Sequence, residues 1–185
     1  MDRSSCCSNE QYSFFYLEPN FVADVPNKKL TLSFVNGFKI EDSRQNMFWG
    51  KNNDEIIYCA AAVGIAMNVN TLAQRYMGAG LSTEAKGHTD DIMSLGVCPN
   101  RKRVVTGSLG ARPDIIVWDS DSMTIIARNK LGRNTRAVSS IRFSKDGKLF
   151  FCTDKHNDSN VYCFKADTAE LLGQNKCGSD PVFDG

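Results

Sequence analysis

The sequence lacks an excess of charge of either sign, because 22 lysines and arginines stand against 21 aspartates and glutamates. Proteins that bind nucleic acid or a membrane surface need an electropositive field, so neither kind of partner is expected. No CxxC pair occurs among the seven cysteines, which argues against a zinc ribbon or a thioredoxin-type site. Most of the cysteines stand within apolar runs, as small buried side chains do in a reducing cytosol.

Long hydrophobic runs and a leader sequence are also missing. The N-terminus, MDRSSCCSNEQ, has no basic segment followed by an apolar one. The longest apolar run covers residues 56–69, which is 14 residues, whereas a membrane-spanning helix needs about 20. No stretch of useful length repeats its apolar residues with the 3.6-residue period of a helix. With 42% hydrophobic residues the chain can still bury a core, and we expect a cytoplasmic protein built from β-strands.

What the sequence does contain is an internal repeat. Residues 87–126 align with residues 133–172 without a gap, at an offset of 46 residues, and the apolar positions match while the polar ones drift. Each copy reads as four short strands separated by turn signals. The expected strands are 92–97, 102–107, 114–119 and 123–128 in the first copy, and 138–143, 148–153, 160–165 and 169–174 in the second. Four strands repeated about every 40–45 residues are typical of a β-propeller blade.

The first copy carries the two dipeptides of a WD-type blade, Gly87-His88 at its start and Trp118-Asp119 at the end of its third strand. In such a blade a His, a Ser or Thr, an Asp and a Trp tie the strands together, because a buried polar group without a partner costs about 1–3 kcal/mol. The residues expected to shape the two blades are His88, Thr106, Ser108, Trp118, Asp119, Asp158 and Phe164. The second copy is more degenerate, since Phe164 replaces the tryptophan.

The repeat also suggests how the chain is organised. We expect an N-terminal arm (1–30), an atypical first blade (31–86), a WD blade (87–132), a degenerate WD blade (133–177) and the start of a further blade (178–185). A closed ring takes four to eight blades, so the all-β fold is expected to be an open part of a propeller with about three four-stranded blades. Its open edges would be covered by the missing blades or by a partner protein.

Upstream of the repeats, the segment VNGFKIEDSRQNMFW is followed by DEIIYCAAAVGIAMN and then by GHTDD. With its Gly37-Phe38 pair, the spacing of Asp42, Arg44 and Asn46, and the apolar run behind them, this segment resembles the hydrophobic (HELP) motif of echinoderm microtubule-associated protein-like (EMAP-like) proteins. PDIIVWDSDSMTII, RAVSSIRFSKDGKLFFCTDKHNDSNV and KCGSDPVFDG are similar to the first WD repeats of that family. The resemblance covers residues 30–185.

The resemblance implies a tandem atypical propeller in which the HELP motif is part of the first propeller. It also implies a non-enzymatic protein that binds tubulin or microtubules of the cytoskeleton, in spindles or in the axoneme of a cilium. Family members usually carry an N-terminal coiled coil and a basic linker, but residues 1–30 have neither heptads nor a basic run. The alternative is a propeller scaffold that mediates protein–protein assembly without direct tubulin binding.

No catalytic or metal-binding constellation stands out, so no enzyme activity, metal or cofactor is expected. His88 beside two aspartates suits the closing histidine of a blade better than a metal ligand. Cys152, His156 and Cys163 would span a strand, a turn and a strand, and they offer only three ligands for zinc.

The one notable basic cluster is Arg101-Lys102-Arg103, in the turn between the first two strands of its blade. A solvated turn is the default interpretation. The sharper hypothesis is a salt-sensitive contact with the acidic surface of tubulin.

Overall fold

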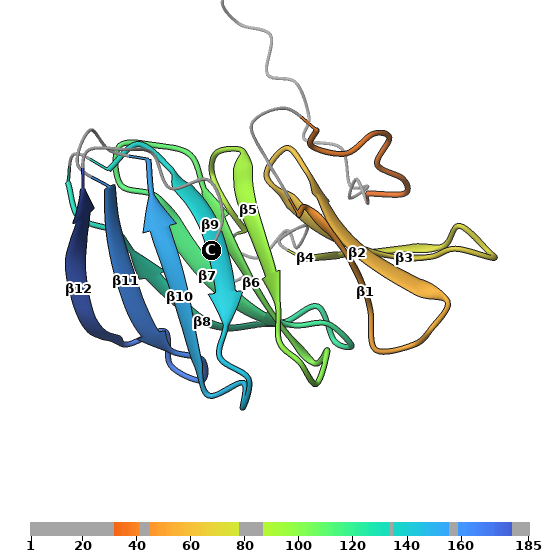
Figure 1. The fold of residues 1–185 in the computed structure, drawn as a ribbon. Helices are drawn as coiled ribbons and strands as arrows, with labels where there is room; N and C mark the ends of the chain where they lie inside the picture. The colour runs from red at the N-terminus through yellow and green to blue at the C-terminus, as the bar shows by residue number, and fades with distance from the viewer. Residues whose placement is uncertain (1–31, 41–44, 78–86, 134, 156–158, 179–185) are drawn as a thin grey trace, which may run out of the picture. The chain divides into compact units, whose positions relative to one another are not determined.

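The structure is a computed structural model that describes residues 32–40, 45–77, 87–133, 135–155 and 159–178. All of them belong to one compact unit, and their strands form three antiparallel four-stranded sheets (Figure 1). The expected N-terminal arm, and residues 179–185 of the expected further blade, lie outside the described residues. The described part of the chain has no helix that is long and apolar enough to cross a membrane.

The first sheet is built on the apolar run that the sequence places upstream of the repeats. Its strands are β1 (Met47–Trp49), β2 (Glu55–Ala60), β3 (Val63–Asn68) and β4 (Gln74–Met77), paired in that order. The turn after β3 is closed by Asn68, whose Oδ1 accepts hydrogen bonds from the backbone N–H groups of Asn70 (3.0 Å) and Thr71 (2.9 Å). Such a side-chain turn ends the strand and reverses the chain.

The two repeat copies form the second and third sheets. The second contains β5 (Ile92–Val97), β6 (Arg103–Ser108), β7 (Asp114–Asp119) and β8 (Ile125–Lys130), and the third contains β9 (Val138–Phe143), β10 (Leu149–Asp154), β11 (Ser159–Lys165) and β12 (Leu171–Gly178). Each strand begins within two residues of its predicted start. The predicted all-β fold of WD-type blades is therefore confirmed, and the three blades do not close into a ring. The domain boundaries remain a prediction.

Strands β5, β6 and β7 of the second sheet are buried on both faces. In β6 and β7, Val104, Ile116 and Trp118 pack into a core shared with the first sheet. Their neighbours along the strands, such as Val105 and Val117, pack into a second core shared with the third sheet. Because successive side chains of a strand point to opposite faces, two cores require a continuous apolar run, and this explains the sequence DIIVW.

Strand glycines allow neighbouring sheets to approach closely. A Cβ atom added to Gly107 of β6 would lie 2.4 Å from Cβ of Val138 in β9. One added to Gly64 of β3 would lie 3.0 Å from Cζ2 of Trp118. Glycine inside a strand is unfavourable in isolation, so its use at these positions is explained by the close packing that it permits.

Candidate functional site

His88 and Thr106 join the segment before β5 to strand β6 of the second sheet. The Nε2 atom of His88 lies 2.8 Å from the Oγ1 atom of Thr106, and the Thr106 hydroxyl donates to the Ile116 carbonyl at 3.4 Å. Burial lowers the pKa of His88 to about 4, while Asp114 opposes this shift and Arg128 adds to it. Within the described residues, His88 Nδ1 and Trp118 Nε1 have no hydrogen-bond partner. Of the blade network expected from the sequence, the histidine and the threonine are therefore in contact.

The burial of His88 predicts a loss of stability in mild acid. In the unfolded chain the pKa of His88 is near 6.5, whereas in the folded chain it is about 4. Between these values the unfolded state binds more protons, so the free energy of unfolding falls as the pH falls. We expect a decrease of about 2 kcal/mol between pH 7.5 and pH 5, measured by urea denaturation at each pH. His88→Gln should remove most of this pH-dependent loss of stability. An equal loss in the variant would show that His88 is not its cause.

Equivalent positions of the two copies hold the start of the third strand in the same way. Ser108 Oγ accepts a hydrogen bond from the Asp114 backbone N–H at 2.9 Å, and Asp154 Oδ1 accepts one from the Asn160 backbone N–H at 2.8 Å. Asp154 lies 46 residues after Ser108, which is the repeat offset. The longer reach of the carboxyl group then allows further contacts that a serine cannot make.

Asp154 is the centre of a buried polar cluster that the sequence analysis missed. Its Oδ2 atom accepts hydrogen bonds from Tyr162 Oη (2.9 Å), Asn160 Nδ2 (3.0 Å) and Thr135 Oγ1 (3.5 Å). Only 1% of Asp154 is exposed. Burial, followed by the bond to Asp154, raises the pKa of Tyr162 to about 12, so its hydroxyl stays a donor. The repeat offset from Ser108 was the signal that could have identified this residue.

We expect Asp154→Asn to lower the free energy of unfolding by about 2 kcal/mol. The amide replaces one acceptor oxygen with a donor, so at least one buried N–H or O–H group loses its partner. Urea denaturation of the variant measures the effect. Asp146→Asn, in the exposed turn between β9 and β10, is the matched control and should change stability by less than about 1 kcal/mol. Equal losses in both variants would argue against a central role for Asp154.

Asp119 and Phe164, two further residues singled out in the sequence, have local structural roles. Asp119 Oδ1 accepts hydrogen bonds from the backbone N–H of Ser122 (2.8 Å) and Asp121 (3.0 Å), which closes the β7–β8 turn. These bonds, led by that from Ser122, hold the Asp119 pKa below its usual value. Phe164 is buried and stacks on Phe150 with ring centroids 5.1 Å apart. Asp158 lies outside the described residues.

The segment before β1 lies along the first sheet. Its Lys39 backbone N–H donates to the Cys59 carbonyl at 3.0 Å, and Asn46 Nδ2 donates to the Lys39 carbonyl. Earlier in the segment, the Val35 backbone N–H donates to Gln74 Oε1 of β4 at 2.8 Å, and Gln74 Nε2 donates to the Val35 carbonyl at 3.0 Å. Gly37 has φ +83°, in the left-handed region that favours glycine, and the following Phe38 is 44% exposed. Asp42 and Arg44, the other expected motif residues, lie outside the described ranges.

The basic turn is divided between neighbouring sheets. Arg101 donates to the carbonyl of Gly50, directly after β1 of the first sheet, at 3.2 Å. Arg103 forms an ion pair with Asp167, in the turn between β11 and β12 of the third sheet. Lys102 is exposed and forms no ion pair with any described residue. Two of the three cations therefore connect blades, and Lys102 alone presents its charge to solvent.

Comparison with known proteins agrees with the order of these elements. The model of the HELP motif matches residues 25–65, and the model of the WD domain, G-beta repeat, matches residues 81–119. The chain carries a HELP motif followed by a WD repeat. The predicted resemblance is thus confirmed, and the segment 32–40 that lies along the first sheet belongs to the HELP motif.

The HELP–WD chain is similar to several longer proteins. It is 29% identical over 168 residues to the ciliary WD repeat-containing protein ctxp80 of Euplotoides octocarinatus, with 86% of this chain and 23% of the relative covered. It is 29% identical over 170 residues to the human echinoderm microtubule-associated protein-like 1, covering 86% of this chain and 20% of the relative. The 77 kDa echinoderm microtubule-associated protein of Strongylocentrotus purpuratus is 30% identical over 166 residues, covering 85% and 23%. The chain spans about a fifth to a quarter of these relatives.

The described residues of the HELP–WD chain offer no ligand set for a metal, since no three His, Cys, Asp or Glu side chains gather among them. His156, one of the three zinc ligands considered above, lies outside these residues. Cys59, Cys98 and Cys152 are buried free thiols. Burial raises the pKa of Cys59 to about 12 and also raises that of Cys152, so neither forms the reactive thiolate at neutral pH.

Proposed function

We propose that this chain is part of a microtubule-associated WD-repeat protein of the cytoskeleton and that it binds tubulin without catalysing a reaction. The observation that carries the proposal is the HELP segment laid along the first blade and followed by WD blades. Relatives that share this region are named as microtubule-associated proteins. The ciliary WD-repeat relative supports a place on the microtubules of a cilium or flagellum.

Of the basic turn, Lys102 is the residue that we propose to contact tubulin. Arg101 and Arg103 would hold the turn in place through Gly50 and Asp167, so that the lysine projects from a fixed backbone. Ser120 adds to this support, because its hydroxyl donates to the Arg101 carbonyl at 2.8 Å. A contact between an exposed lysine and an acidic surface weakens as salt screens the charges.

Co-sedimentation with stabilised microtubules tests this proposal. We expect the chain to pellet at low salt, and Lys102→Glu to raise the apparent dissociation constant about threefold to tenfold, since one exposed charge pair contributes up to about 1 kcal/mol and reversal adds repulsion. Lys145→Glu, at another exposed turn, has the same charge change and should bind as the parent does. A folded chain that stays in the supernatant at low and moderate salt would overturn direct binding.

A scaffold that assembles with another protein and does not touch tubulin is the second candidate. The observation that favours it is β12, a sheet-edge strand on which all eight residues are exposed. Unpaired edge strands are ready to pair with another chain. Under this function the chain would be recovered in a stable complex with a partner protein and would show no tubulin affinity of its own.

A further inference from the structure

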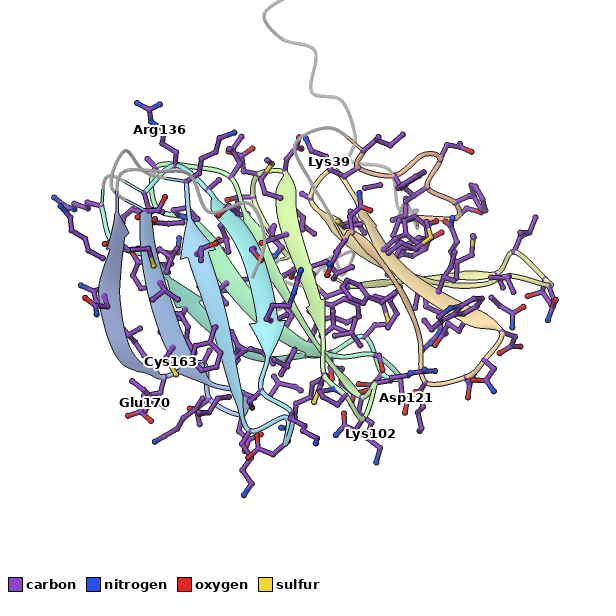
Figure 2. The ribbon with its side chains drawn as sticks, in the orientation of Figure 1. Lys39, Lys102, Asp121, Arg136, Cys163 and Glu170 are labelled. Atoms are coloured by element: carbon purple, nitrogen blue, oxygen red, sulfur yellow. The ribbon has the colours of Figure 1, made fainter. Side chains whose placement is uncertain are left out.

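A second basic surface lies at the other end of the sheets from the Arg101–Arg103 turn. Figure 2 shows Arg136 at one end, and Lys102, Asp121 and Glu170 at the opposite end. Connections at the Arg136 end include 109–113, between β6 and β7, and the described residues 131–133 and 135–137, between β8 and β9. Lys155 follows directly after β10. They belong to the second and third sheets.

Backbone hydrogen bonds hold these connections against one another. The Gly110 N–H donates to the Arg136 carbonyl at 2.9 Å, and the Lys155 N–H donates to the Ala137 carbonyl at 2.9 Å. Leu109 and Ala137 also form an isolated antiparallel bridge. The three connections therefore form one fixed surface, in which the middle connection is bonded to both of its neighbours.

The side chains on this surface are predominantly basic. Arg112, Arg133, Arg136 and Lys155, which we call the loop patch, are all exposed. Among the described residues none of the four forms an ion pair. Four cations on adjoining connections, with no carboxylate partner among the described residues, produce a local positive potential although the chain as a whole carries only +1.

Nearby carboxyl groups offset only part of this charge. Asp154 is buried beneath its hydrogen-bond donors, and Asp114 is buried with Lys130 Nζ at 3.4 Å. Asp91 is paired with Lys39 at 3.6 Å. Asp90 is the exposed acid at the edge of the patch, where its Oδ2 lies 3.6 Å from a Cβ atom built on Gly110. Counting the described residues, the loop patch thus remains positive towards solvent.

We propose that the loop patch docks an acidic peptide segment of a partner protein. The cations come from three separate connections, so they suit several carboxylates along an extended chain better than one phosphate ion. Three of the four are arginines, whose guanidinium groups bind carboxylates in a bidentate manner. Leu109, in the connection between β6 and β7, is 38% exposed and adds an apolar contact for a peptide side chain. Nucleic acid fits less well, because it requires a broader basic field than a nearly neutral chain provides.

Fluorescence anisotropy with a labelled ten-residue peptide rich in glutamate tests the inference. We expect binding at low salt that weakens as salt is added, and no binding of the matching glutamine peptide. The triple variant Arg112→Gln/Arg136→Gln/Lys155→Gln should weaken binding by about tenfold or more, because each exposed charge pair contributes a few-fold. Circular dichroism melting of the variant checks that it remains folded, since its three side chains are exposed.

The matched control removes the same charge from the opposite end, with Lys145→Gln/Lys148→Gln/Lys165→Gln, all of which are exposed. It should bind the glutamate peptide as the parent does. Equal losses in the two triple variants, equal binding of the glutamine peptide, or stronger binding of a single-stranded oligonucleotide would each overturn the proposal. The inference goes beyond the proposed function. The peptide assay tests the loop patch alone, and microtubule co-sedimentation tests tubulin binding, so either proposal can fail without the other.

Discussion

Replacing Trp118 with alanine is expected to lower the free energy of unfolding by about 3–5 kcal/mol, the range found for large aromatic side chains removed from a core. Trp118 is 0% exposed. It lies in the core between the first and second sheets, where its ring packs over Gly64. The substitution therefore leaves a cavity between two blades that the glycine cannot fill. Urea denaturation followed by circular dichroism measures the loss.

The second tryptophan provides the control for this prediction. Trp49 in β1 is 55% exposed, so Trp49→Ala should change stability by less than about 1 kcal/mol. If Trp118→Ala does not fold, Trp118→Phe retains most of the apolar volume and should show a smaller loss that is still measurable. Equal effects of the alanine substitutions at Trp118 and Trp49 would mean that Trp118 is not central to the core.

Gly107→Ala is expected to destabilise the chain by about 3 kcal/mol through the opposite mechanism, since it adds an atom where there is no room. The new Cβ would lie 2.4 Å from Cβ and 2.6 Å from Cγ1 of Val138, and 2.8 Å from Oγ of Ser94. Because β9 carries Val138 in a neighbouring sheet, relief of the clash requires the second and third sheets to move apart. The melting temperature and the urea midpoint should both fall.

A glycine in open space separates the steric effect from the intrinsic preference of the residue. Gly173 in β12 has no atom within 4 Å of an added Cβ. Gly173→Ala should therefore leave stability unchanged or raise it slightly, since alanine loses less backbone entropy on folding. A comparable loss at both glycines would show that close packing of the sheets is not the reason for Gly107.

The strands were predictable from the sequence because a blade repeats its apolar pattern and marks its turns. Trp118 and Phe164 occupy the same register 46 residues apart, and both are fully buried or nearly so. The ends of the strands were less predictable, since β12 continues to Gly178, past the predicted end at residue 174. The added length follows from pairing with β11, in which Ser159 lies opposite Gly178.

The polar contacts were less predictable because their partners meet only after the sheets have formed. Asp154 accepts hydrogen bonds from Thr135, which lies between β8 and β9, and from Asn160 and Tyr162 of β11. Arg103 finds its partner Asp167 in another blade. A basic triplet in a sequence predicts a charged turn, but which of its charges remain available depends on acids that lie far away along the chain.

Because β5, β6 and β7 are buried on both faces, the three sheets form a linear stack with the second sheet in the middle. The first and third sheets each share a core with the second, so the stability of each outer unit includes an interface term with the middle one. Damage to an outer blade affects one interface, whereas damage to β6 or β7 weakens two at once. We therefore expect the amide protons of the middle blade to be the last to exchange.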